Sequence, residues 1–273
     1  MMHLREALAI GVQERVISII GGGGKTTLLY RLAADFAAAG ERVLLTTTTK
    51  MFRPAVHEVD ELIITGEGMS DMASIVEFIG RSELSHREKG SAESGAERCG
   101  ERIFLAGGFL PGNKIRGIET GQVTELTKRD YFNYILVEAD GAARRSGKGY
   151  AAHEPNIPAV SDLVIIVAGL DLLGGKLTAS CVHRAALAAK QIGFPEGADI
   201  DEEVAARLIA LGVQKAWRQA ARARRAAFLN KADNPQGLEK GMNIAKRLLS
   251  GGLVERVLIG SCLSADPVAA LLQ

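Results

Sequence analysis

The sequence predicts an α/β fold in which a mostly parallel central sheet is flanked by helices in three layers. The first observation is an apolar run at residues 16–20, typical of a buried strand, that leads into four glycines, a lysine and two threonines. The second is that residues 28–36 place apolar side chains on one helical face. The third is a later apolar strand, residues 134–137, that ends in carboxylates. Strands that alternate with helices in this way favour a parallel sheet.

The glycine-rich turn has the composition of a phosphate-binding loop. Glycines let successive backbone N–H groups point at phosphate oxygens, and the helix that follows adds the positive end of its dipole. The strict pattern G-x-x-x-x-G-K-[ST] needs a glycine where this chain has Ile19, so the match is to its closing half. A turn without a ligand is the alternative, but the strand and helix on either side favour a P-loop NTPase-like fold. The loop consists of Gly21, Gly22, Gly23, Gly24, Lys25, Thr26 and Thr27.

Four residues, two in the loop and two after the strand at 134–137, are expected to act directly on a nucleotide and its Mg²⁺. Lys25 supplies positive charge to phosphate from an exposed loop position, so its replacement should leave the fold intact. Thr26 can ligate Mg²⁺. Glu138 and Asp140 follow the strand at 134–137, where one carboxylate would orient the hydrated cation and the other a nucleophile. The alternative is that these carboxylates cap a turn.

A second strand, residues 41–45, runs into four threonines and Lys50. The carboxyl end of a strand beside the phosphate-loop strand faces the ligand crevice of a parallel sheet. Thr46 and Thr47 fit a β-branched strand extension equally well. Function is favoured for Thr49 and Lys50, because the strand should have ended there.

Two irregular segments carry further candidates. Residues 107–117 read as a glycine-rich loop in which Lys114 and Arg116 would lie over an anionic ligand. Residues 144–158 combine charged side chains with two prolines, which excludes regular structure, and Lys148, His153 and Glu154 are candidates for contacting substrate or phosphate. Plain surface connections are the alternative in both places.

Asn230, Lys231 and Asp233 form the pattern N-K-x-D after a predicted strand at 226–229. The pattern resembles the guanine-recognition motif of P-loop GTPases, in which the aspartate accepts hydrogen bonds from the base. Ser261 and Cys262 follow the next predicted strand, where those GTPases place a further base-contacting loop. We therefore expect GTP to be favoured over ATP.

The remaining pattern predicts a single domain over residues 1–273. Strands are expected at 61–65, 103–106, 162–168 and 254–259, and helices at 71–79, 123–128, through 181–187 and within 201–224. Asp266 and Pro267 should open a final short helix. Residues 81–102 are almost free of apolar side chains and are expected to form a flexible insertion.

Composition narrows the class of protein. Hydrophobic residues make up 47% and charged residues 24%, which is ordinary for a globular enzyme. A net charge of +1 gives no reason to expect a nucleic-acid partner or an anionic membrane. Three widely spaced cysteines suit free thiols, and no apolar segment approaches membrane-spanning length, so a cytoplasmic protein is expected. The oligomeric state, including a homodimer, stays open.

Taken together with the Gly-Lys-Thr-Thr loop, the motifs T-T-T-T-K-M, K-I-R-G, V-E-A-D-G and K-x-x-x-x-H-E-P-x-I-P resemble the YqeC family, and the resemblance is spread over residues 21–158. That family is described as accessory proteins for selenium-dependent molybdenum hydroxylases. The sequence departs from its pattern at Ala142 and Ala143, where the family tends to have serine and arginine, and at Tyr150, where it tends to have proline. Arg144 is the residue that can take over the arginine's role.

The resemblance implies a nucleotide-dependent step in making or installing the selenium-containing molybdenum cofactor. The leading hypothesis is a maturation factor that hydrolyses GTP or ATP with Mg²⁺ and acts on a client molybdenum hydroxylase or its cofactor. A small-molecule kinase or ATP-dependent ligase that uses Lys50, Lys148 and His153 is the second hypothesis. A nucleotide-binding module without turnover is the third.

Overall fold

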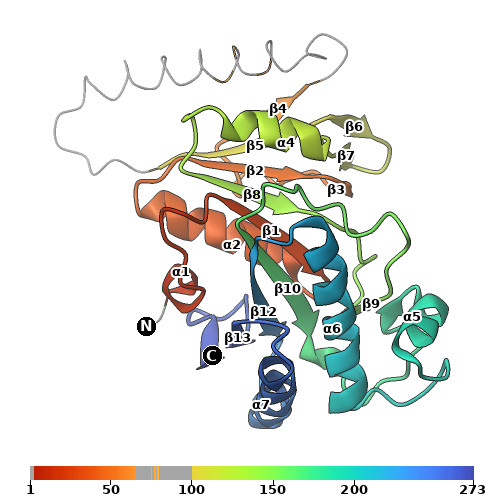
Figure 1. The fold of residues 1–273 in the computed structure, drawn as a ribbon. Helices are drawn as coiled ribbons and strands as arrows, with labels where there is room; N and C mark the ends of the chain where they lie inside the picture. Colours follow the sequence, from red (N-terminus) through yellow and green to blue (C-terminus); the bar gives the residue numbers. More distant parts are fainter. Residues whose placement is uncertain (1–2, 66–74, 76, 78, 80–99) are drawn as a thin grey trace.

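The structure, a computed structural model, describes residues 3–65, 75, 77, 79 and 100–273. Its main feature is a nine-stranded sheet in the order β14-β13-β12-β10-β1-β8-β2-β5-β4 (Figure 1). All neighbouring strands in this sheet are parallel except β13 and β14. The expectation of an α/β fold with a mostly parallel central sheet is confirmed. The strands are β1 (Val16–Gly21), β2 (Val43–Thr47), β4 (Glu61–Ile64), β5 (Arg102–Ala106), β8 (Tyr134–Glu138), β10 (Leu163–Gly169), β12 (Arg224–Asn230), β13 (Arg256–Gly260) and β14 (Val268–Leu272).

Strand β1 lies at the point where the chain changes direction across the sheet. It pairs with β8 on one side and with β10 on the other. The chain first builds β2, β4 and β5 on the β8 side, and after β8 it continues through β10, β12 and β13 on the opposite side. In open parallel sheets, ligands bind at the carboxyl ends of the strands at such a switch point. The turn after β1 occupies that position.

Helices cover both faces of the sheet. On one face, α1 (Leu4–Ala7) and α2 (Lys25–Ala38) pack against Ile17 and Ile19 of β1. On the other, α4 (Thr120–Thr127), α6 (Glu202–Gln219) and α7 (Pro235–Ser250) share a core with Val16 and Ile20, and α5 (Ala185–Ile192) packs beside α6. Because side chains alternate along a strand, β1 contributes side chains to the hydrophobic cores on both faces of the sheet. No helix in the described part of the chain is long and apolar enough to cross a membrane.

Two small sheets lie beyond the carboxyl ends of the large one. β3 (Lys50–Phe52), β7 (Lys114–Arg116) and β6 (Gly108–Leu110) form an antiparallel sheet, and β9 (Gly147–Lys148) pairs with β11 (Val182–His183). Residues 107–117 were expected to be a loop and instead form the β6–β7 hairpin. Residues 144–158 are largely irregular, as expected, apart from the short β9.

The expected final helix is wrong. Residues 268–272 form β14, an antiparallel edge strand paired with β13. A proline just before a strand is tolerated as readily as one at the start of a helix, so Asp266 and Pro267 could not decide between them. The helix expected through 181–187 begins only at Ala185, because Arg184 has a left-handed backbone with φ of 56°. The helix at 71–79 and the insertion at 81–102 lie largely outside the described residues.

Candidate functional site

The glycine-rich loop is shorter than the strict pattern suggests. Ile19 lies inside β1, opposite Glu138 of β8, so the loop proper spans only residues 22–24 before α2 begins at Lys25. Gly24 has a φ of 134°, and a Cβ on it would lie 2.1 Å from the side-chain nitrogen of Asn230. Only glycine fits there, because both the backbone conformation and the space exclude a side chain.

Five consecutive backbone N–H groups, from the end of the loop into the first turn of α2, lack an acceptor among the described residues. Within the described residues, no hydrogen bond is recorded from the N–H of residues 23–27, whereas Gly22 donates to the Val167 carbonyl at 2.9 Å. Gly21 donates to Asp140 Oδ2 at 3.0 Å. Residues 23–27 line a cavity of about 460 Å³. Unpaired N–H groups at a helix N-terminus bind anions, because they carry the positive end of the helix dipole.

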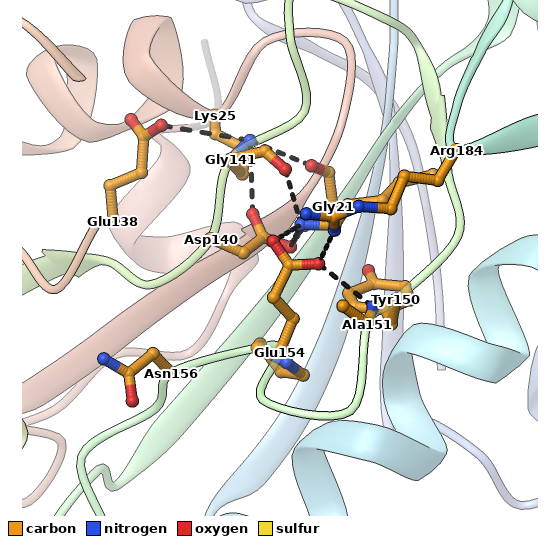
Figure 2. Close-up of polar contacts among 12 residues, drawn as sticks. Gly21, Lys25, Glu138, Asp140, Gly141, Tyr150, Ala151, Glu154, Asn156 and Arg184 are labelled. Atoms are coloured by element: carbon orange, nitrogen blue, oxygen red, sulfur yellow. Dashed lines mark hydrogen bonds and ion pairs between the residues drawn. The ribbon is translucent and has the colours of Figure 1, made fainter. Parts of the chain in front are cut away.

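Lys25 is buried beside this cavity, with only 6% of its surface exposed. Its ammonium donates to the Gly21 carbonyl at 2.9 Å and lies 3.2 Å from Asp140 Oδ1 and 3.9 Å from Glu138 Oε1 (Figure 2). Burial lowers the pKa of Lys25, but attraction to Asp140 and Glu138 outweighs it, so the net shift is upward. The expectation of an exposed lysine is wrong, because the loop folds back over the end of β8.

Glu138 is the carboxylate of β8 that lines the cavity. Thr26 Oγ1 donates a 2.7 Å hydrogen bond to Glu138 Oε2. Burial raises the pKa of Glu138, and Lys25 and Thr26 only partly offset this. Among the described residues, no group of three or more His, Cys, Asp and Glu side chains could hold a metal ion. A Mg²⁺ ion on Thr26 and Glu138 would therefore need water or phosphate oxygens to complete its ligands.

Asp140 lies beneath the loop and does not line the cavity. It is 1% exposed, accepts from the Gly21 N–H and pairs with Lys25 and with Lys148, whose Nζ is 3.2 Å from Asp140 Oδ2. Oδ2 accepts the Gly21 hydrogen bond, whereas Oδ1 lies 3.2 Å from the Lys25 ammonium and has no hydrogen-bond partner among the described residues. Asp140 therefore holds the loop and Lys25 in place, and Glu138 is the carboxylate of this pair that lines the cavity.

Lys148 is buried between two carboxylates. Its Nζ lies 3.2 Å from Glu154 Oε1 as well as from Asp140, and it also donates to the Gly141 carbonyl. Arg184 pairs with the other oxygen of Glu154. Burial raises the pKa of Glu154, but Lys148, the N–H of Ala151 and Arg184 together lower it below its ordinary value. Lys148 therefore neutralises and positions Asp140, and its own side chain is buried within the protein.

The charge of the cavity lining is strongly positive. Among the described residues that line it, Glu138 is the one carboxylate, opposed by six cationic side chains from five parts of the chain. A polyanion would be attracted to this surface. The cations are Lys25, Lys50, Lys114, Arg144, Arg145 and Lys231.

The N-K-x-D segment contacts the glycine-rich loop. Asn230 Nδ2 donates to the Gly23 carbonyl at 2.7 Å, and Asn230 Oδ1 accepts from the Cys262 N–H at 2.8 Å. Lys231 Nζ bonds Ser146 Oγ at 3.0 Å and pairs with Asp171 Oδ2 at 2.7 Å. The loops after β12 and β13, which the sequence predicts to recognise the base, therefore meet at the side chain of Asn230. Asp233 is exposed and lies outside the cavity lining.

Other candidates lie outside the cavity. Arg116 is exposed and bonds the Gly107 carbonyl, and His153 is exposed on a turn. The hydroxyls of Thr46 and Thr47 are buried and donate to the backbone carbonyls of Leu105 and Glu138, which favours their structural role. Sequence reasoning missed Phe52, because a lone aromatic residue after a strand carries no motif.

The fold and the site define an α/β protein with a cationic cavity at the switch point of a parallel sheet. The chain belongs to the YqeC family, since the family model described as "YqeC protein" matches residues 17–186. A protein of Escherichia coli (strain K12) described as "Uncharacterized protein YqeC" is 32% identical over 177 residues. That match covers 64% of this chain and 60% of the relative's length.

Proposed function

We propose that this protein binds a Mg²⁺–nucleoside triphosphate in the cavity at the end of β1 and hydrolyses it. The observation that carries the proposal is the run of unpaired N–H groups at residues 23–27, placed beside the Lys25 ammonium in one cationic cavity. Backbone donors and a lysine at a helix N-terminus are the groups that cradle phosphates in nucleotide-binding loops. A cavity of about 460 Å³ is also within the size range of small-molecule sites.

The residues of the site have distinct roles in this proposal. Lys25 and the N–H groups hold the phosphates and stabilise the charge that grows on the leaving oxygen. Thr26 and Glu138 would hold a Mg²⁺ ion, which would supply positive charge to neutralise the phosphates. Glu138 also accepts a hydrogen bond from the attacking water. The water oxygen bonds to the terminal phosphorus while Glu138 takes one of its protons, and the bond to the bridging oxygen breaks with its electron pair staying on the nucleoside diphosphate. The diphosphate and phosphate are then released, and the proton passes from Glu138 to solvent.

The base is proposed to lie toward residues 230–233 and 261–262. The contact of Asn230 with Gly23 and Cys262 supports this placement, because it joins the phosphate loop to both base loops. In this position Asp233 accepts from the base, and GTP is favoured over ATP.

The biological role is proposed from the family resemblance. Hydrolysis would serve maturation of a selenium-dependent molybdenum hydroxylase or its cofactor. A small-molecule kinase or ATP-dependent ligase is the second candidate, and the cations Lys50 and Lys114, which line the cavity from the adjacent strands β3 and β7, favour it.

The test is a thermal-shift screen of nucleotides with and without Mg²⁺, followed by assays of phosphate release. Stabilisation by Mg²⁺–GTP and release of inorganic phosphate, faster in the presence of a client hydroxylase, would support a maturation NTPase. Transfer of phosphate to a metabolite would support the kinase instead. Absence of any nucleotide effect would refute both.

A further inference from the structure

We propose that the cavity contains a second subsite, formed by Lys50, Phe52, Lys114 and Arg144, that binds a small anionic molecule carrying a phosphate or carboxylate group. The proposal rests on the proposed nucleotide function, because the second ligand would lie beyond the terminal phosphate. It adds a substrate class to a site so far described only by its nucleotide.

The subsite is built on one face of the small antiparallel sheet. Phe52 of β3 is paired directly with Lys114 of β7, and Lys50 lies two residues before Phe52, so the three side chains share a face. Met51, between them in sequence, points to the other face and is buried. Lys50, Phe52 and Lys114 are exposed and all line the cavity.

Phe52 holds two cations together. Lys114 Nζ lies 5.3 Å and Arg144 Cζ 4.6 Å from the centroid of its ring, which is within the range of cation–π contacts. The ring attracts the cations but carries no charge that could neutralise them. Among the described residues, no ion pair with a carboxylate is recorded for Lys50, Lys114 or Arg144. Like charges held this close repel one another, and an anion bound between them removes that repulsion.

The position of the subsite fits a second ligand better than a nucleotide base. The base loops follow β12 and β13, on the β10 side of β1, whereas Thr26 and Glu138 meet at the end of β8. The small sheet lies farther in the same direction, after β2 (Figure 1). A nucleotide with its base near Asn230 and its Mg²⁺ near Glu138 therefore directs its terminal phosphate toward Lys50 and Phe52.

The same small sheet contains a matched control. Arg53 Cζ lies 5.3 Å from the ring centroid of Phe109, at the same distance as Lys114 from Phe52. Arg53 and Phe109 fall on the opposite face, since Phe109 is paired with Ile115, and neither lines the cavity. Loss of Arg53 removes an exposed cation from the sheet without touching the subsite.

The experiment is a calorimetric titration of phenyl phosphate into protein saturated with Mg²⁺ and a non-hydrolysable nucleoside triphosphate, with benzoate as the carboxylate arm. The parent should bind one equivalent of at least one probe. Lys114→Ala and Arg144→Ala should each weaken that binding about tenfold, because each removes a charge-assisted hydrogen bond. Arg53→Ala should bind like the parent.

The proposal is overturned if neither probe binds saturably, if Arg53→Ala weakens binding as much as Lys114→Ala, or if the nucleotide and the probe exclude one another. The last result would mean that Phe52 and its cations hold part of the nucleotide. If the protein binds no nucleotide at all, the proposed function fails. In that case the probes are titrated without nucleotide. The subsite proposal then stands only if Lys114→Ala binds a probe more weakly than Arg53→Ala does.

Discussion

Thr26 Oγ1 and Glu138 Oε2 are joined by a 2.7 Å hydrogen bond that connects the first turn of α2 to the end of β8. The bond places two oxygens that can face one cation at the edge of the cavity. Because Glu138 is held at the cavity in this way, the two carboxylates at the end of β8 have different roles. Glu138 faces the cavity, and Asp140 lies beneath the loop.

Glu138→Gln should therefore reduce turnover more than nucleotide binding. The neutral amide binds Mg²⁺ weakly and does not polarise water, so the rate of phosphate release should fall about a hundredfold. The measurement is steady-state hydrolysis with calorimetric affinity for the substrate. Glu125→Gln is the matched control, since Glu125 lies on the surface of α4 and pairs with Lys128. A parental rate in Glu138→Gln would make this carboxylate structural.

Asp140→Asn should act mainly on stability. The carboxylate is enclosed between Lys25 and Lys148, and its loss removes one of the two buried carboxylates beside each ammonium, leaving Lys25 with Glu138 and Lys148 with Glu154. Breaking such pairs costs on the order of 3–5 kcal/mol, which urea unfolding can measure. Asp130→Asn is the control, because the Asp130 side chain is 96% exposed and pairs only at the surface with Arg15. Equal stability of parent and Asp140→Asn would contradict this role.

Lys25→Ala should lose nucleotide binding and should also destabilise the protein. Removal of the ammonium leaves Glu138 and Asp140 buried without it. The pKa of Glu138 is already raised by burial, so its contribution favours folding below its ordinary value of 4.5 and is lost as pH rises through the raised pKa. The destabilisation by Lys25→Ala should therefore be larger near pH 8 than near pH 5. Urea unfolding at both pH values tests this, and a pH-independent difference would count against it.

Glu154 should show the opposite dependence. Its pKa is lowered because Lys148, the Ala151 N–H and Arg184 together outweigh burial, so its stabilising contribution is present above its ordinary value of 4.5. That contribution is lost as pH falls through the lowered pKa. The stability difference between the parent and Glu154→Gln should therefore shrink below pH 4.5. A difference that grows in acid would show that the pairs with Lys148 and Arg184 do not stabilise the carboxylate.

Asp233→Asn should remove a preference for GTP over ATP. The variant replaces one acceptor of the carboxylate with a donor and leaves a base donor unpaired, which costs on the order of 1–3 kcal/mol. Calorimetry with both nucleotides on parent and variant measures the effect. Better binding of ATP than of GTP by the parent would mean that residues 230–233 do not recognise guanine.

Much of the framework could be predicted from sequence because its signals are local. The apolar strands β1 and β8 and the glycines between β1 and α2 follow from composition and spacing. The end of the chain could not be assigned, because the apolar residues 268–272 fit a helix or a strand until β13 offers an edge for pairing.

The site was predictable only in part, because burial is set by contacts between distant segments. The sequence predicts Lys25 and Lys148 to be accessible cations, yet each is buried beside carboxylates from other segments of the chain. Phe52 and Arg144 are brought together by the β3–β7 pairing and by the turn after β8, and no sequence pattern links them.

The most direct test of the account is calorimetric titration of Mg²⁺–GTP and Mg²⁺–ATP into the parent and into Lys25→Ala, at a pH where circular dichroism shows both folded. The account predicts saturable, Mg²⁺-dependent binding of one nucleotide per chain to the parent, and none to Lys25→Ala. No binding of either nucleotide to the parent, or unchanged affinity in Lys25→Ala, would contradict the proposal that residues 23–27 and Lys25 form a phosphate site.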